Sequence, residues 1–226
     1  MPHRDQPGGG QPRPVEGEDH PKKKTLYADE QGRPDVVEAR AAFRVEQATC
    51  DLDTRVFVDE FGINLDMTRR YARAPQGARA VGSVPGRTAG NITLVFGIRQ
   101  GVGVVAPNLI RGPMTNELFE AYVNDTLGPA LHRGDIVVTD RLNAHTAATT
   151  EAAIEAHHAH LELLPPYSPD LTPIENAGAK VKAALRKAAA RTWEALVDAA
   201  ADALRSVTPD DVYGWLKHAG FRPKLE

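Results

Sequence analysis

Two short apolar runs, each closed by an aspartate, constrain the fold of this chain more than any other feature. Asp59 ends the run Arg55-Val56-Phe57-Val58, and Asp140 ends the run at 135–139. A third acid, Glu175, follows the Pro-rich stretch at 165–174, and 34 residues separate it from Asp140. Two strand-end aspartates and a helix-borne glutamate can hold two divalent cations about 3.5–4 Å apart for in-line attack on a phosphodiester. Asp59, Asp140 and Glu175 are therefore the candidate catalytic residues and metal ligands.

The order of the predicted elements indicates an α/β fold with a mixed sheet and helices on both faces. Strand signals come first, and Gln100-Gly101 predicts a hairpin turn. Later the pattern alternates between helix and strand. Strands are expected at 54–59, around 63–72, at 92–98, 102–110, 136–140 and 161–164, and helices at 35–48, 116–127 and 146–157 and after Thr172, Thr192 and Thr208.

The expected topology brings the acids together. The passage from 136 to 164 is long enough for a right-handed parallel crossover. If the strand at 54–59 lies beside the one at 136–140, Asp59 and Asp140 meet where α/β sheets bind ligands. A helix that begins near Pro173 then has only to cross this edge to add Glu175. This is the ribonuclease-H-like, or retroviral-integrase-like, arrangement.

The sequence divides into three expected parts. Residues 1–24 contain Gly8-Gly9-Gly10, five prolines and almost nothing apolar, so this tail is expected to be disordered. Residues 25–53 are expected to form a linker helix, and residues 54–226 the catalytic domain with its C-terminal helices. The single cysteine, Cys50, excludes an internal disulfide and favours a cytoplasmic protein. The sequence contains no apolar run of the roughly 18 residues that a membrane span needs.

The net charge of −3 does not favour nucleic acid as a partner, but the distribution of charge does. Residues 67–90 carry five arginines and no acid, and residues 176–193 carry five Lys and Arg residues and no acid. Such segments can bind DNA phosphates, although solvated surface charge is an equally good interpretation of either segment alone. The candidate DNA-binding residues are Arg69, Arg70, Arg73, Lys180, Lys182 and Arg186.

Two candidate residues have rival structural roles. Thr172-Pro173-Ile174-Glu175 fits a capping box, so Glu175 could simply cap its own helix. His145, five residues beyond Asp140, could orient a ligand or a phosphate, or it could begin a helix. The group His157, His158 and His160 is better explained as a solvated turn than as a metal cluster, because neighbouring side chains point in different directions.

Three segments resemble the mariner-like bacterial insertion-sequence transposases, and most closely family six-thirty. They are Val58-Asp59-Glu60-Phe61-Gly62, Val137-Val138-Thr139-Asp140 with His145, and the run from Leu164 to Asn176. The resemblance extends from about Lys22 to about Phe221. It implies that Asp59, Asp140 and Glu175 are ligands of two Mg²⁺ or Mn²⁺ ions in a DDE-superfamily endonuclease and strand transferase.

The resemblance also implies partners. These are double-stranded DNA at the ends of an element, a target containing a TA dinucleotide, and a second copy of the chain on DNA in the nucleoid. The family's N-terminal helix-turn-helix domain is expected on a separate polypeptide, because this chain begins near the linker to the catalytic half. Two residues depart from the family: Phe61 replaces a small residue, and Arg141 replaces an asparagine. A cation at position 141 is expected to weaken metal binding.

Two other functions fit the sequence. One is a catalytically impaired transposase remnant that binds DNA or oligomerises as a regulator. The other is a host nuclease with the same fold. Cleavage of element-end DNA that depends on Mg²⁺ or Mn²⁺ separates the transposase from the remnant, and inverted repeats beside the gene separate it from the host nuclease.

Overall fold

The computed structural model describes residues 28–86 and 90–223. The predicted disordered tail, residues 25–27 of the predicted linker and Arg87 all lie outside the described residues. Within the described ranges, no helix combines the length and the apolar character that crossing a membrane requires.

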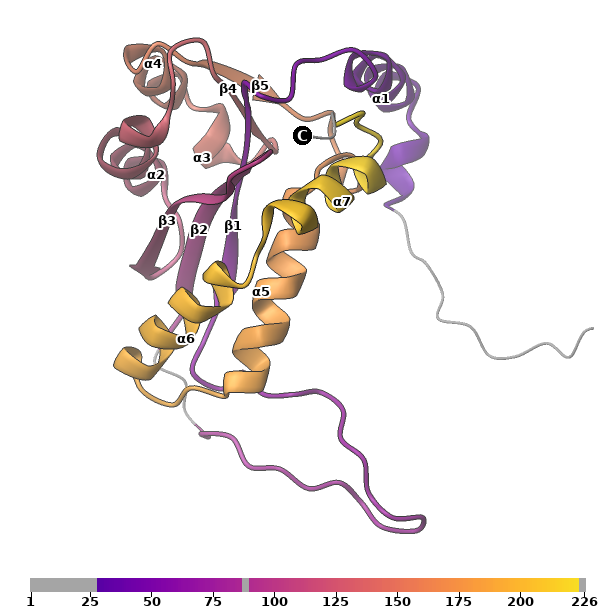
Figure 1. Cartoon of the computed structure of the whole chain (residues 1–226), viewed down its shortest axis with the longest axis vertical. Coiled ribbons are helices and arrows are strands. Elements are labelled where there is room, and N and C mark those ends of the chain that lie inside the picture. The colour runs from indigo at the N-terminus through magenta and orange to yellow at the C-terminus, as the bar shows by residue number, and fades with distance from the viewer. Residues whose placement is uncertain (1–27, 87–89, 224–226) are drawn as a thin grey trace, which may run out of the picture.

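Five strands form one mixed sheet in the order β3-β2-β1-β4-β5 (Figure 1). β1 pairs antiparallel with β2 and parallel with β4, while β2–β3 is the predicted antiparallel hairpin and β4–β5 is parallel. The strands are β1 (Arg55–Ile63), β2 (Ile92–Arg99), β3 (Gly103–Arg111), β4 (Ile136–Thr139) and β5 (His160–Leu163).

The register between β1 and β4 aligns the two aspartates. Arg55 pairs with Ile136 and Phe57 pairs with Val138. The same offset, continued two residues further, places Asp59 level with Asp140. β4 ends at this point, whereas β1 continues to Ile63. Asp59 therefore lies in the middle of its strand and not at its end, because β2 pairs with β1 along its whole length.

Helices cover both faces of the sheet, as the sequence predicts. Phe57, Phe61 and Ile63 of β1 face a core shared with the α1 and α5–α7 group, and Val56 and Val58 face a core shared with the α2–α4 group. Side chains in a strand alternate between the two faces, so one strand serves both cores. The helices are α1 (Pro34–Gln47), α2 (Asn116–Tyr122), α3 (Asn143–Thr146), α4 (Ala148–Ala156), α5 (Ile174–Ala188), α6 (Trp193–Arg205) and α7 (Pro209–Ala219).

Several helix ends differ from expectation. Thr115, not Asn116, caps α2, and the predicted helix to Leu127 continues as a π-helix, Val123–Leu127, and a 3-10 turn, Gly128–Ala130. The helix expected at 146–157 is two short helices, α3 and α4. The predicted cap of α7 is confirmed, since Thr208 and Asp211 form a reciprocal capping box and Gly220 ends the helix with a φ of 103°.

The predicted strand around 63–72 is wrong beyond Ile63. Residues 64–86, which we call the arm, contain no helix or strand and project from the foot of the sheet (Figure 1). Every residue from 68 to 84 is exposed, and the side chains of Tyr71 and Val81 are each 90% accessible. The described residues of the arm pair with no strand of the sheet.

α1 is more than a linker. Its Val36 and Phe43 are buried, and the Phe43 ring meets the edge of Phe221 from the C-terminal segment at a centroid distance of 6.3 Å. Gln47 Nε2 donates to the carbonyl of Leu171 at 3.0 Å and to that of Ala219 at 3.1 Å. α1 is therefore packed into the same core as α5–α7.

Candidate active site

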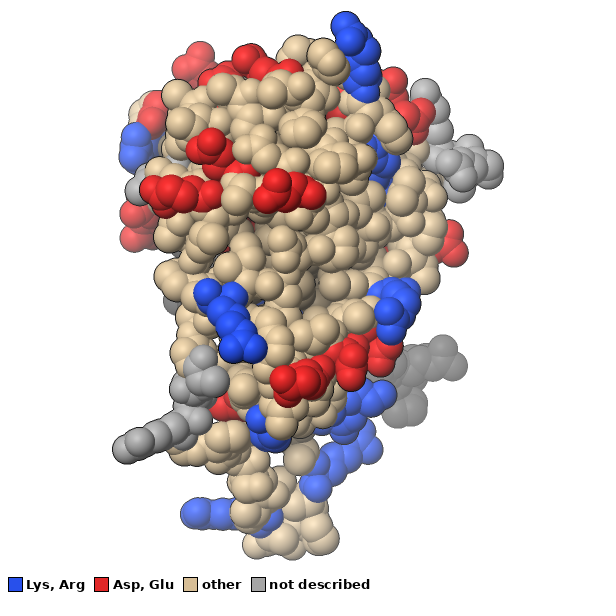
Figure 2. All heavy atoms as spheres, turned by 90° about the vertical axis from the view of Figure 1, so that its left-hand side faces the viewer, with Lys and Arg blue, Asp and Glu red and all other residues tan. Residues whose placement is uncertain are grey.

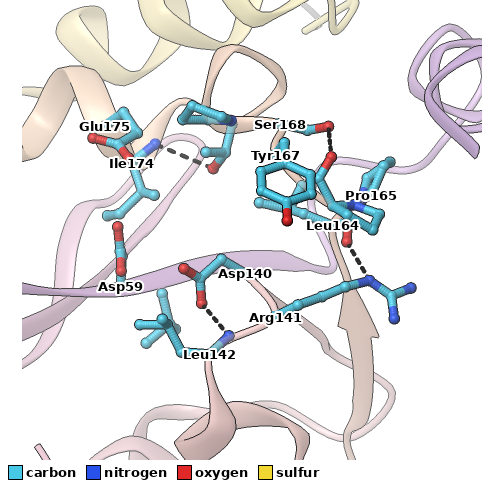
Figure 3. A pocket seen from close by; sticks show the side chains of 14 residues that line it. Asp59, Asp140, Arg141, Leu142, Leu164, Pro165, Tyr167, Ser168, Ile174 and Glu175 are labelled. Carbon is cyan, nitrogen blue, oxygen red and sulfur yellow. Dashed lines mark hydrogen bonds between the residues drawn. The ribbon is translucent and has the colours of Figure 1, made fainter. Parts of the chain in front are cut away.

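The three predicted carboxylates line one cavity of about 490 Å³. They come from three separate elements: Asp59 from β1, Asp140 from the turn after β4, and Glu175 from the first turn of α5. The opposite wall is the Pro-rich loop with Tyr167 (Figure 3). The structure therefore brings the three acids to one cavity, and their role as catalytic residues and metal ligands stays a prediction.

Asp59 is the most perturbed of the three. By strand alternation it lies on the same face as Phe57 and Phe61, beneath α5. Burial raises the pKa of Asp59 to about 8, and the nearby charges of Glu60, Asp140 and Glu175 add to the effect. The backbone N–H of Glu60 donates to Asp59 Oδ1 at 2.8 Å and lowers the pKa only partly. No cationic side chain is among the causes, so the negative charge of ionised Asp59 is left without compensation.

Asp140 is held in place by its own turn. Its Oδ1 accepts from the backbone N–H of Leu142 at 3.0 Å and lies 2.6 Å from Nδ1 of His145. His145 is fully buried and packs against the Phe119 ring at a centroid distance of 4.4 Å. The imidazole is thus fixed, and it fixes Asp140 in turn.

Glu60 completes this arrangement and was not predicted. His145 Nε2 lies 2.8 Å from Glu60 Oε2, which is an ion-pair distance, although the angles at these two atoms are not those of a hydrogen bond. Burial opposes protonation of His145, but Asp140 and Glu60 outweigh it and raise the pKa of His145 to about 9. The signal was present in the sequence, because adjacent strand residues point to opposite faces: Asp59 faces α5 and Glu60 faces α3.

Glu175 does not cap α5. The residue at the N-cap position is Pro173, and no side chain caps this helix end. Thr172 Oγ1 instead accepts from the backbone N–H of Ile174 at 3.4 Å. Burial raises the pKa of Glu175, Lys182 opposes the rise, and Asp140 adds to it. The capping alternative is therefore wrong, and the carboxylate is free to act in the cavity.

The donor set suits divalent cations that favour oxygen ligands. The lining of the cavity offers three carboxylates, and the high pKa of Asp59 marks an excess of negative charge that a cation would relieve. Among the described residues, no three His, Cys, Asp or Glu side chains close around a single point. Mg²⁺ usually takes only one or two protein carboxylates and keeps several waters, so an open set of acids fits it.

Arg141 lines the same cavity as the three acids, but its side chain turns away from them. Its Nε donates to the carbonyl of Leu164 at 2.9 Å, and the side chain extends away from Asp140 toward the end of β5 (Figure 3). The expected weakening of metal binding by this residue therefore has no support in the geometry.

Phe61, the other departure from the family, is matched by Gly178. A Cβ at Gly178 would lie 2.1 Å from the Phe61 ring, so only glycine lets α5 approach β1 here. Phe61 also packs on Phe96 at a centroid distance of 5.3 Å. The large residue in β1 and the absent side chain in α5 together set the height of α5, and of Glu175, above the sheet.

The Pro-rich loop is tied to α1. Arg40, which is buried, donates to Ser168 Oγ at 2.8 Å and to both carboxylate oxygens of Asp170, at 2.8 and 2.7 Å. Gln31 Nε2 donates to the carbonyl of Tyr167 at 2.6 Å. Tyr167 itself has a φ of 55°, which is unusual for a residue other than glycine. α1 therefore holds the wall of the cavity that faces the acids.

The six predicted DNA-binding residues divide into three groups. Arg69, Arg70 and Arg73 are exposed on the arm, and Lys182 and Arg186 lie half-buried on α5. Lys180 instead forms an ion pair with Asp211, the capping residue of α7, so it is used within the fold. Figure 2 shows Lys and Arg side chains gathered at the lower end of the molecule, around the root of the arm.

Comparison with known proteins places this geometry among endonucleases. A family model described as DDE superfamily endonuclease matches residues 54–197, which contain all three acids. A comparison with curated protein sequences gives no match.

Several solved structures share the fold. The Mos1 transposase paired-end complex with left transposon end superposes with a TM-score of 0.74 at 16% identity, covering 91% of this chain and 65% of that chain. The mariner Mos1 paired-end complex with Mg gives 0.72 at 15% identity, covering 90% and 64%. The catalytic domain of Mos1 mariner transposase gives 0.57 at 16% identity, covering 88% and 93%. The predicted ribonuclease-H-like fold is confirmed by these similarities, and the chain spans 65% of the length of the first of these Mos1 chains.

Proposed function

The chain belongs to the DDE superfamily endonucleases, and from that premise we propose that it is the catalytic domain of a DNA transposase. It cuts DNA at the ends of an insertion sequence and joins the freed end to a target at a TA dinucleotide. The observation that carries this proposal is the gathering of Asp59, Asp140 and Glu175 on one cavity at the junction of β1, β4 and α5.

Two Mg²⁺ or Mn²⁺ ions are the cofactors that fit this cavity, with Asp59, Asp140 and Glu175 as their protein ligands. When bound, such a pair supplies positive charge to both the attacking and the leaving oxygen of a phosphodiester. Among the structural neighbours, Mos1 complexes with Mg and with Mn are named as such, which supports the same choice here.

The protein's own residues prepare the cavity. Asp59 must give up its proton to bind a cation, and its pKa of about 8 makes this step dependent on pH. His145 and the backbone N–H of Leu142 orient Asp140, so the carboxylate does not have to be ordered when substrate arrives. The buried faces of β1 and α5 exclude water from one side of the site.

Double-stranded DNA is the proposed substrate. Arg69, Arg70 and Arg73 on the arm, with Lys182 and Arg186 on α5, would hold its phosphates without reading sequence. A helix-turn-helix polypeptide would supply recognition of the element ends, and a second copy of the chain would hold the other end. The similarity of the fold to a Mos1 transposase complex with a transposon end supports double-stranded DNA as the substrate.

The test is cleavage of labelled element-end duplex by the chain with its helix-turn-helix partner, in Mg²⁺, in Mn²⁺ and in EDTA. Asp140→Asn should abolish cleavage while leaving DNA affinity within about twofold, because it removes a metal ligand and leaves the basic surface intact. Asp198→Asn, an exposed position on α6, is the matched control and should cut normally. Tight binding without cleavage by the wild-type chain would favour the regulatory remnant. Cutting of any duplex, with no effect of element ends, would favour the host nuclease.

A further inference from the structure

A second cavity, of about 530 Å³, lies between the root of the arm and α5. Three cations line it, Arg70 from the arm and Lys182 and Arg186 from α5, against one acid, Asp66. Its floor is the end of β1, and Met67 and Val84 add apolar surface. A hollow with two excess positive charges is suited to an anion.

The second cavity and the active-site cavity are both bordered by β1 and α5. Asp59 and Gly62 are three residues apart on β1, and one borders each cavity. On α5, Glu175 borders the first cavity, and Lys182 and Arg186 border the second. Residues 7 and 11 positions apart fall on nearly the same helix face, and they lie about 10 and 16 Å along the axis. Glu175, Lys182 and Arg186 therefore lie along one face of α5.

The three cations are available for a ligand. None of them makes an ion pair within the described part of the chain, whereas the neighbouring Lys180 pairs with Asp211. Lys182 Nζ lies 4.8 Å from the centre of the Phe61 ring, which holds the ammonium in place without neutralising it. The lining of the second cavity thus keeps its positive charge.

The wall that carries Arg70 is anchored to the body of the protein. Arg191 Nη1 donates to the carbonyl of Leu65 at 2.9 Å and to that of Met67 at 3.0 Å. These bonds fix the root of the arm beside the C-terminal end of α5. Arg70, three residues beyond Met67, lines the second cavity together with Arg186.

From this geometry we propose that the second cavity binds a single backbone phosphate of the substrate DNA, three to five nucleotides from the phosphate that is cut. The proposal rests on the proposed function, since the cut defines the position. Phosphates of one strand follow each other by about 3.4 Å along the axis of B-DNA, so 10 to 16 Å corresponds to about three to five of them. Two arginines can each present a pair of N–H donors to one phosphate, and a lysine adds a point charge.

The first experiment measures binding, with no need for cleavage. Affinity of the Asp140→Asn chain for a random duplex is titrated against salt concentration, alone and with Arg70→Gln, Arg186→Gln or both. Because the cavity cations share one phosphate, the single variants should each lose no more than one contact, and the double variant should lose about 0.9 in the slope of log Kd against log salt and not twice that. Lys187→Gln, on the same helix but outside the second cavity, is the matched control, and combining it with Arg186→Gln should give additive changes in slope.

The second experiment uses the position of the cut. A set of element-end duplexes, each carrying one uncharged methylphosphonate at a different position beside the cut, is digested in Mn²⁺ by the chain with its helix-turn-helix partner, and the products are mapped. The chain with intact cavity residues should cut about tenfold less often at the bonds three to five nucleotides from the neutral group, on one side of it. Arg186→Gln should remove this gap in the pattern, and Lys187→Gln should keep it.

The outcomes separate this inference from the proposed function. If the salt slopes change as expected but the wild-type chain never cuts DNA, the phosphate site is supported and the proposed transposase activity is overturned. A loss of about twice 0.9 in slope for the double variant would mean two independent contacts and overturn the single-phosphate site. Cutting with no gap, or a gap that Arg186→Gln does not alter, would overturn the placement of the phosphate.

Discussion

At the scale of single residues, the site depends on two neighbours in β1 that face opposite ways. Asp59 points under α5 into the cavity, and Glu60 points to the other face, where it meets buried His145. Burial raises the pKa of Asp59 to about 8, and the neighbouring carboxylates add to the rise, whereas Glu60 lies at an ion-pair distance from His145. In the metal-free protein Asp59 is therefore protonated at neutral pH.

Asp59 should make the metal-free protein less stable as pH rises. Its pKa is about 8 when folded and about 3.9 in an unfolded chain, so between these values the folded state binds the extra proton. The unfolding free energy contributed by this group then falls from about pH 4 to pH 8. Urea unfolding in EDTA at pH 5 and pH 8 should show a smaller loss for Asp59→Asn than for the wild type.

In the proposed function a divalent cation takes the place of that proton, so we expect Mn²⁺ at pH 8 to raise the Tm of the wild type and to have little effect on Asp59→Asn. Asp198→Asn should behave as the wild type in both solutions. Equal pH dependence in the wild type and Asp59→Asn would show that Asp59 titrates normally, and the site would lose its main electrostatic feature.

Glu60→Gln should loosen Asp140 through His145. Removing one of the two carboxylates that hold the imidazolium should lower the pKa of His145 from about 9 toward its ordinary value, as followed by NMR of the ring. We expect a loss of about 1–3 kcal/mol in unfolding free energy and slower cleavage, with partial recovery in Glu60→Asp. An unchanged pKa of His145 would mean that the 2.8 Å contact has no electrostatic effect.

At the scale of elements, the contact between β1 and α5 decides where Glu175 stands. Gly178→Ala places a methyl group inside the Phe61 ring, and overpacking of this kind costs about 1–3 kcal/mol. Gly214→Ala in α7 is the matched control, because no atom lies within 4 Å of its added Cβ, and it should stabilise by up to about 1 kcal/mol. Thermal unfolding of both variants tests the contrast.

If the contact between the added Cβ and the Phe61 ring causes the destabilisation, Gly178→Ala should cost much less unfolding free energy in a Phe61→Ser background than in the wild type. A double-mutant cycle should give a coupling of about 1 kcal/mol or more between the two positions. Additive losses would mean that Gly178 is needed for a reason other than Phe61.

The elements also show what sequence patterns can and cannot predict. The hairpin turn at Gln100-Gly101 and the start of α7 after Thr208 are local features, and both were predicted correctly. The meeting of Asp59 and Asp140 followed from one assumption about neighbouring parallel strands. Residues 64–72 were mistaken for a strand because their composition permits one, whereas in the structure β1 ends at Ile63.

The sequence could not predict contacts between residues far apart in the chain, because no hydrophobic periodicity links such residues. Arg40 meets Ser168 and Asp170 across 128 and 130 residues, and no local pattern links them. The direction of Arg141, away from the acids, depends on the carbonyl of Leu164 at the end of β5. Glu60 was passed over because its partner, His145, lies 85 residues further along the chain.

At the scale of the whole molecule, the arm is the part of the described chain with the least support from the core. Its four described arginines, Arg69, Arg70, Arg73 and Arg79, are exposed and without regular structure, so trypsin should cut after them early while the sheet stays intact. Saturating duplex should slow these cuts at least severalfold if the arm lies on DNA. Mass spectrometry of timed digests identifies the sites, and cuts after Arg205 in the ordered α6 serve as the reference.

The hydrogen bonds from Arg40 to the Pro-rich loop give α1 a second consequence, which concerns temperature. The hydrogen bonds that hold Ser168 and Asp170 of the active-site wall come from one side chain of α1, Arg40, so we expect this attachment to open while the sheet persists. Arg40→Leu should therefore be temperature-sensitive. It should cleave DNA almost as well as the wild type at low temperature, and it should lose cleavage several degrees below the Tm of the whole protein. Faster hydrogen exchange at 165–173 with unchanged exchange in β2 would reveal that local opening. Variation in a helix remote from the three acids can thus tune the thermal range of the reaction without changing its chemistry.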